Sequence, residues 1–273
     1  KLVEKRRRGR FGLGPLGAAV KANPGISAMI EHHAHLYTDL SDPVALLRGE
    51  VSRTALADYW PYADGNHPDA LQADQVADYS HLMSLSLPLV ADEVLDAYRL
   101  SRHRCLLDVG GGEGVFGESA AARNPDLKVM VFDLPAVADR ARARLTGRGL
   151  DKRIDAIGGD FLSDPLPKGA DAISLVRVIL DHDDTNALRI LQAVHAALPQ
   201  NGVILLAEPL AETPGAEPVG AYFNMYLRAM GRGRPRNFDQ ISALLTKAGF
   251  DQIRLKVGRH VLRTGVVTAT PQR

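Results

Sequence analysis

The stretch Leu106-Leu107-Asp108-Val109-Gly110-Gly111-Gly112-Glu113-Gly114 runs from an apolar segment straight into a glycine-rich turn, and a helical pattern follows it. Glycines let a backbone adopt positive φ and approach a ligand closely. Ligands of open α/β sheets bind at the carboxyl ends of the strands. The stretch therefore predicts an α/β domain whose ligand site lies at this turn.

Short β-rich segments alternate with helical patterns after residue 102. The predicted strands are Cys105–Gly110, Lys128–Leu134, Arg153–Asp160, Ala172–Ile179 and Gly202–Glu208. Such alternation is typical of parallel strands joined by crossover helices. Gln252–Val257 and Gly265–Thr270 lack a long helix between them, which predicts an antiparallel pair that closes the sheet. We therefore expect a Rossmann-like, mostly parallel sheet with an antiparallel last strand.

The bulk composition is that of an ordinary globular protein, since 45% of the 273 residues are hydrophobic and 24% are charged. A net charge of +1 gives the molecule as a whole no electrostatic attraction to nucleic acid. No apolar run of bilayer-spanning length and no signal-peptide pattern occur. Cys105 is the single cysteine, which excludes an internal disulfide and a thiolate metal cluster. These features predict a protein of the reducing cytoplasm.

The first 102 residues have a different pattern. Residues 1–20 predict two short strands around the basic turn Arg6-Arg7-Arg8-Gly9, which we interpret as a solvated hairpin tip rather than a nucleic-acid contact. Between Pro24 and about Arg102 apolar residues recur at helical spacing, and prolines separate the helices. The sequence starts abruptly at Lys1, so we expect the natural chain to extend upstream.

Two cofactors compete for the glycine turn. Gly112–Gly117 satisfies the GxGxxG pattern of dinucleotide binding, so NAD is one alternative. Against NAD, Asp108 precedes the glycines, where a carboxylate opposes a pyrophosphate but suits the cationic amino group of S-adenosylmethionine (SAM). Asp133 ends the next predicted strand, where it is placed to bind ribose hydroxyls. Asp160 ends the strand after that and stands beside Phe161, whose ring can flank adenine. Helix capping is the alternative role of each aspartate.

Four motifs resemble the small-molecule O-methyltransferases of the plant caffeate and bacterial acetylserotonin type. They are LLDVGGGEG (106–114), VFDLP (131–135), GGDF (158–161) and VRVILDHDDTNALRIL (176–191). The resemblance covers nearly the whole chain and implies SAM as cofactor, S-adenosylhomocysteine as product and a homodimer. It also implies three parts: the wing hairpin remnant of an N-terminal winged-helix domain (1–22), a helical linker for dimerisation and acceptor binding (23–102), and a SAM-binding domain (103–273).

The resemblance assigns residues to the site and leaves no role for a metal. The cofactor would be held by Asp108, Gly110, Gly112, Gly114, Asp133, Leu134, Asp160, Phe161 and Arg177. The acceptor pocket would be lined by Met83, Tyr222, Phe223, Met225 and Met230.

The family's proton acceptor is missing from its usual place. The family has a His-Asp-Trp-Asp-Asp run after the fourth strand, and here Leu180 takes the place of its histidine and His182 that of its tryptophan. Glu208 matches one of the two carboxylates that flank the base, whereas Pro235 stands at the other position. We therefore name His182, Asp181 and Glu208 as the catalytic candidates.

Plainer roles remain open for these residues. His182 and the acids around it also suit a polar helix start, and helix capping explains Asp183 and Asp184 more simply than a Mg²⁺ site does. His32 and the histidines at 33 and 35 have a spacing that suits no single helix face, so we expect no metal there.

Residues 207–237 resemble bacterial carotenoid hydroxyl methyltransferases of the hydroxyneurosporene and demethylspheroidene type. This resemblance implies an acyclic hydroxycarotenoid acceptor, reached by peripheral contact with the inner membrane. An aliphatic tertiary alcohol is too weak an acid for a histidine to deprotonate beforehand, which agrees with Leu180. The alternatives are a bacteriochlorophyll precursor, an aromatic polyketide or phenol as acceptor, an NAD-dependent oxidoreductase, and a non-catalytic SAM-binding module.

Overall fold

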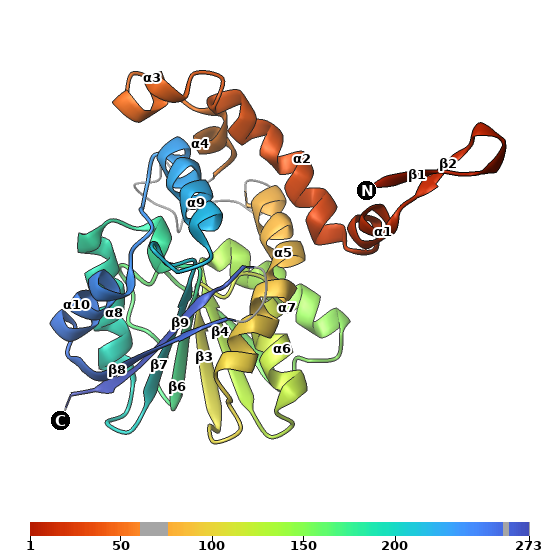
Figure 1. Ribbon diagram of the computed structural model, residues 1–273. Helices are drawn as coiled ribbons and strands as arrows, with labels where there is room; N and C mark the ends of the chain where they lie inside the picture. The colour runs from red at the N-terminus through yellow and green to blue at the C-terminus, as the bar shows by residue number, and fades with distance from the viewer. Residues whose placement is uncertain (61–75, 259–261, 273) are drawn as a thin grey trace.

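The computed structural model describes residues 1–60, 76–258 and 262–272, with a seven-stranded sheet of order β5-β4-β3-β6-β7-β9-β8 at its centre (Figure 1). The strands of this sheet are β3 (Cys105–Val109), β4 (Lys128–Asp133), β5 (Ile154–Gly158), β6 (Ala172–Val176), β7 (Val203–Glu208), β8 (Phe250–Val257) and β9 (Gly265–Pro271). Strands β3 to β7 pair in parallel, and β9 pairs antiparallel with both β7 and β8. The predicted fold class and its antiparallel end are confirmed.

Two predicted strands end two or more residues earlier than the sequence indicated. Strand β6 stops at Val176 because Arg177 turns into the left-handed region with φ 57°. Strand β5 stops at Gly158, so Asp160 lies in the following turn and not at the strand end itself.

Helices cover both faces of the sheet because neighbouring strand residues point to opposite sides. Leu106 packs in the core with α5, α6 and α7, whereas Leu107 packs with α8 and α10. The bounds of these helices are α5 (Ala77–Ala97), α6 (Val115–Arg123), α7 (Pro135–Gly147), α8 (Asp184–Ala197) and α10 (Phe238–Lys247). The central strands are thus covered on both faces, and the glycine turn lies at the carboxyl end of the sheet.

A third apolar cluster joins the remaining helices over that end of the sheet (Figure 1). These helices are α2 (Pro24–Asp39), α3 (Pro43–Arg48), α4 (Ala55–Tyr59) and α9 (Glu217–Met230). Capping fixes where they start: the Asn23 side chain accepts hydrogen bonds from the N–H groups of Gly25 and Ile26, with Pro24 at the first helical position. The helical segment predicted from Pro24 onward is therefore present, as several separate helices.

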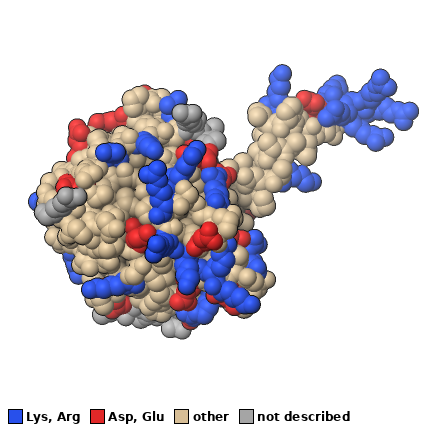
Figure 2. Space-filling view, turned by 90° about the horizontal axis from the view of Figure 1, so that it is seen from below, with Lys and Arg blue, Asp and Glu red and all other residues tan. Residues whose placement is uncertain are grey.

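The N-terminal segment projects from this body. Strands β1 (Val3–Lys5) and β2 (Phe11–Leu13) form the predicted antiparallel hairpin, which α1 (Pro15–Ala22) connects to α2. Lys and Arg side chains gather at its far end (Figure 2). Within the described ranges, no helix combines the length and apolar character needed to cross a bilayer.

Candidate functional site

A cavity of about 560 Å³ opens at the carboxyl ends of β3, β4, β5 and β6, beneath α4, α5 and α9. Its volume falls in the usual range for small-molecule sites. Seven of the predicted cofactor residues line it: Gly110, Gly112, Asp133, Leu134, Asp160, Phe161 and Arg177. Residues that the sequence placed on separate segments thus meet at one cavity.

The glycine turn uses positive φ at Gly110 (67°), Gly112 (57°) and Gly114 (79°). A Cβ on Gly110 would lie 2.7 Å from Cγ2 of Val178, so only glycine fits there. A Cβ on Gly112 would meet no atom of the described residues within 4 Å, so this backbone faces open space in the cavity. Gly114 precedes α6 and does not line the cavity, which makes it a residue of the turn rather than of the ligand wall.

Asp133, the last residue of β4, braces this turn. Its Oδ2 accepts a hydrogen bond from the Gly112 N–H at 2.7 Å, and its Oδ1 accepts from the Leu134 N–H at 2.8 Å. Burial raises the pKa of this carboxyl to about 6, although both hydrogen bonds favour the charged form. Asp133 therefore holds Gly112 in place and presents acceptor oxygens at the cavity wall.

Asp108 lies at the end of β3, just before the glycine turn, as predicted, but its side chain is buried. It is one position inside β3 and pairs in register with Ser174 of β6, whose hydroxyl donates to Asp108 Oδ1 at 2.6 Å. The side chain is 1% exposed, and Asp108 is not among the residues that line the cavity. Its Oδ2 has no hydrogen-bond partner among the described residues, and burial raises its pKa to about 7. The expected direct contact of Asp108 with a ligand amino group does not follow from this position.

The hydrogen bonds of the turn disfavour a pyrophosphate. Gly110 and Gly111 donate their N–H groups to the Phe132 carbonyl, Gly112 donates to Asp133, and Gly114 donates to the Gly111 carbonyl. Dinucleotide sites need such N–H groups free for the phosphate oxygens. The geometry therefore argues against NAD.

Phe161 lines the cavity between the ends of the strands and the segment that follows β6. Its ring meets that of His182 edge to face, with centroids 5.5 Å apart. The adjacent Asp160 stabilises the turn that it begins, because its Oδ1 accepts a hydrogen bond from the Leu162 N–H at 2.8 Å. An aromatic face and a carboxylate thus sit side by side on the wall.

Two of the catalytic candidates lie at the 3-10 turn Ile179–Asp181, since Asp181 is its last residue and His182 follows it. Asp181 and His182 both line the cavity, whereas Leu180 is buried in the cluster below α9. Burial and the nearby Arg232 lower the pKa of His182 to about 4, so this imidazole is neutral at neutral pH. Burial raises the pKa of Asp181 to about 7, against the opposing effect of Arg177 and Arg232.

Glu208 lies behind this turn and does not line the cavity. Its Oε1 accepts the N–H groups of Val178 at 3.1 Å and Ile179 at 2.8 Å. Burial and the charge of Asp181 raise its pKa to about 8. Its position is that of an anchor for the backbone under Asp181, and its catalytic role stays a prediction.

Arg236 anchors the same segment from the other side, a role that no local sequence pattern indicates. Its guanidinium donates to the carbonyls of Ile179 at 2.8 Å and His182 at 2.7 Å, and to Asp184 Oδ1 at 2.9 Å.

Asp183 caps α8 by accepting from the Asn186 N–H at 2.8 Å, as the capping alternative predicted. No group of His, Cys, Asp and Glu suited to a metal ion occurs in the described part of the chain.

The predicted acceptor residues divide into two groups. Met83 and Met230 line the cavity, and the Met83 sulfur accepts a hydrogen bond from Arg177 Nη2 at 3.0 Å. Tyr222, Phe223 and Met225 are not lining residues and pack instead at the edge of the third apolar cluster. Trp60, Tyr79 and Leu87 line the cavity but were missed, because nothing local in the sequence brings the end of α4 over the strand ends.

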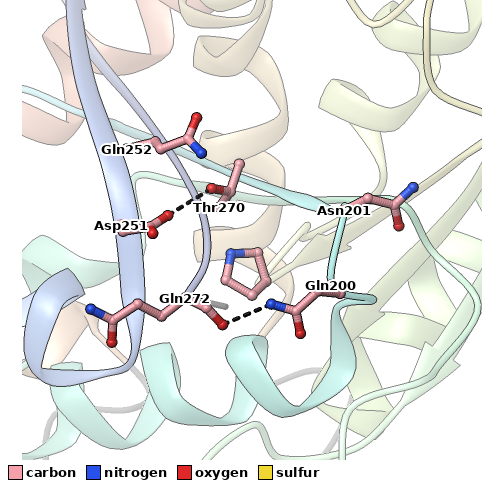
Figure 3. A pocket seen from close by; sticks show the side chains of 7 residues that line it. Gln200, Asn201, Asp251, Gln252, Thr270 and Gln272 are labelled. Carbon is pink, nitrogen blue, oxygen red and sulfur yellow. Dashed lines mark hydrogen bonds between the residues drawn. The ribbon is translucent and has the colours of Figure 1, made fainter.

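A second pocket, of about 490 Å³, lies at the far end of the sheet between the loop after α8 and the edge strands (Figure 3). Four of its seven lining residues are paired with one another: Asp251 Oδ1 accepts from the Thr270 hydroxyl at 3.0 Å, and the Gln200 side chain donates to the Gln272 carbonyl at 2.7 Å. It contains none of the predicted site residues.

Residues 37–251 match the family described as the O-methyltransferase domain. The chain is 44% identical over 272 residues to demethylspheroidene O-methyltransferase of Cereibacter sphaeroides, and the match covers 98% of this chain and 71% of that protein. It is 42% identical over 260 residues to the protein of the same name from Rhodobacter capsulatus, covering 93% of this chain and 62% of that protein.

The fold is similar to that of human N-acetylserotonin methyltransferase, solved in complex with SAM. The TM-score is 0.82 at 21% identity, and the match covers 100% of this chain and 80% of that chain. At this identity the likeness concerns the fold alone.

Proposed function

The chain belongs to the O-methyltransferase domain family, as its motifs predicted, and on this basis we propose that it transfers a methyl group from SAM to a hydroxyl group of an acyclic hydroxycarotenoid. The carotenoid acceptor is supported by the near full-length similarity to demethylspheroidene O-methyltransferases.

The observation that carries the cofactor proposal is the joint position of Gly112 and Asp133. Gly112 leaves open space beside its backbone, and Asp133 holds that backbone while offering carboxylate oxygens at the wall. A ribose with two hydroxyl donors fits such oxygens, and Phe161 offers a face to an adenine ring. We propose that Gly110, Gly112, Asp133, Leu134, Asp160, Phe161 and Arg177 hold SAM and S-adenosylhomocysteine.

When bound, SAM supplies an electrophilic methyl group on a sulfonium. The protein's part is to hold the acceptor oxygen in line and to exclude water, which can lower a barrier by several kcal/mol. The proton leaves the acceptor oxygen late, as the oxygen–carbon bond forms. Asp181, with a pKa of about 7, is a better acceptor for it than His182, with a pKa of about 4. Glu208 and Arg236 fix the backbone that presents Asp181.

Exposed apolar side chains on the N-terminal segment support a dimer. Apolar side chains are exposed along the hairpin and the first helices, including Leu2, Phe11, Leu13, Leu16 and Ile30. We propose that residues 1–22 are the wing of a winged-helix dimerisation domain, that residues 23–102 join it to the SAM-binding domain (103–273), and that the protein is a homodimer. A lipidic acceptor would bring this cytoplasmic dimer to the surface of the inner membrane.

The test is a substrate panel with labelled SAM: an acyclic hydroxycarotenoid, a phenolic acid and a chlorin. We expect label in the carotenoid only. Label in the phenol or the chlorin would replace the acceptor proposal, and tight NADH binding without SAM binding would overturn the cofactor proposal.

A further inference from the structure

An aromatic pair forms part of the cavity wall opposite the strand ends. Trp60 follows α4 and Tyr79 belongs to α5, and both line the cavity. Their ring centroids are 4.2 Å apart and the planes are tilted by 43°. Helices α4 and α5 thus place two aromatic rings against each other beside the site.

A buried hydrogen-bond chain holds the Trp60 ring. The indole Nε1–H donates to the Tyr226 hydroxyl at 3.4 Å, and the Tyr226 oxygen lies 2.7 Å from Nε2 of His32. Tyr226 and His32 are 6% and 5% exposed. Burial, with the charges of the two neighbouring histidines, lowers the pKa of His32 to about 4, so the ring is neutral. In the tautomer that carries its proton on Nδ1, Nε2 accepts a hydrogen bond from the Tyr226 hydroxyl. The chain therefore runs from Trp60 to Tyr226 to His32, joining α4, α9 and α2 (Figure 1).

These hydrogen bonds determine which part of the Trp60 side chain faces the cavity. The only polar atom of the indole is engaged by Tyr226, so Trp60 presents carbon and π surface to the cavity. The residues that line the same cavity include Leu87 and Met230, which are apolar, and Met83, whose sulfur accepts a hydrogen bond from Arg177. Aromatic faces and flexible thioethers bind flat, polarisable apolar groups.

We propose that Trp60 and Tyr79 determine acceptor specificity by forming the wall against which the conjugated chain of a polyene lies, with Tyr226 and His32 as positioning residues for the Trp60 ring. The identity of the acceptor as a polyene rests on the proposed function. The assignment of the wall rests on the contacts of Trp60 and Tyr79.

The first experiment uses Trp60 as a reporter, because it is the only tryptophan in the chain. Its emission is recorded while the protein is titrated with an acyclic hydroxycarotenoid in detergent micelles, with a polyene of equal length that lacks the hydroxyl, and with a phenolic acid. Detergent alone and SAM alone are the controls, and absorbance is corrected with free tryptophan. We expect saturable quenching by both polyenes and little by the phenolic acid. Quenching by the phenolic acid alone, or by no acceptor while SAM still binds, would overturn the proposal.

The second experiment separates acceptor binding from cofactor binding. Trp60→Leu and Tyr79→Leu should each raise the KM for the carotenoid about tenfold, the low end for loss of an apolar contact in a specificity pocket. The Kd for SAM, measured by calorimetry, should change by less than about twofold, because the cofactor residues lie on other elements. Tyr37→Phe, at a ring that is 70% exposed on α2, is the matched control and should leave both constants unchanged.

Tyr226→Phe tests the positioning role. It removes the hydroxyl between Trp60 and His32 and keeps the ring, so the Trp60 emission should shift in wavelength and the carotenoid KM should rise about threefold, a modest loss for one hydrogen bond. If Trp60→Leu fails to fold, Trp60→Phe with Tyr79→Leu provides the same comparison. If these variants methylate the carotenoid with an unchanged KM, the proposed specificity role of Trp60 and Tyr79 is wrong and the proposed function still holds. If the unaltered protein does not bind SAM, the proposed function itself is wrong.

Discussion

Glu208 Oε1 accepts a hydrogen bond from the backbone N–H of Ile179 at 2.8 Å and so ties the end of β7 to the turn that carries Asp181. The carboxyl is 2% exposed, and its other oxygen has no hydrogen-bond partner among the described residues. Burial raises its pKa from 4.5 to about 8. The folded protein is therefore most stable when the Glu208 carboxyl is protonated.

The pH dependence of stability follows from that pKa. Because the folded pKa is raised, the contribution of Glu208 is fully present below pH 4.5 and is lost as pH rises through about 8. Glu208→Gln keeps an acceptor for the Ile179 N–H and cannot ionise. We expect its Tm to exceed that of the unaltered protein above pH 8, by about 2–4 °C for each 1 kcal/mol of unfolding free energy that ionisation of Glu208 removes. The difference in Tm should shrink at pH 6. Scanning calorimetry at both pH values checks this, and a constant difference would show that ionisation of Glu208 plays no part.

Asp133→Ala should weaken SAM and S-adenosylhomocysteine binding by about 1–3 kcal/mol, because the Gly112 N–H and a ribose would both lose their acceptor. Isothermal calorimetry measures the loss. Asp139→Ala is the matched control, since Asp139 lies on α7 in an exposed ion pair with Arg142. Normal SAM binding by Asp133→Ala would contradict the assignment of the ribose site.

Gly110→Ala should abolish SAM binding and lower the Tm, because its Cβ would lie 2.7 Å from Val178 and its φ of 67° disfavours any side chain. Gly147→Ala, near the end of α7 with no described atom within 4 Å of the new Cβ, should be neutral or slightly stabilising. Calorimetry and thermal melting of both variants provide the comparison. A Gly110→Ala variant that binds SAM normally would show that the turn can relax.

The pH–rate profile should distinguish Asp181 from His182. With a pKa of about 7, Asp181 should make kcat/KM rise as pH increases through 7, and Asp181→Asn should remove that rise. His182→Ala should keep the rise and lower kcat by no more than about 10²-fold, since a pKa of about 4 makes it a weak base. A loss of more than about 10⁴-fold in His182→Ala would make the histidine the true base.

Most of the fold was predictable because its signals are local. The alternation of strands and helices, the glycine turn and the caps at Asn23 and Asp183 depend on residues close in sequence. Asp133 lines the cavity because it is the last residue of its strand. Strand ends were less predictable, since the left-handed Arg177 that ends β6 is held by the Ala207 carbonyl of the next strand.

The sequence by itself determined the family, the sheet and the carboxyl-end site, since motifs and periodicity encode them. Only the tertiary structure decided which of those residues reach the cavity. Asp108 turns to Ser174 because it lies one position inside its strand. Trp60 reaches Tyr226, 166 positions away along the chain. Side-chain direction depends on strand register and on packing between distant helices, and neither is encoded in a short stretch of sequence.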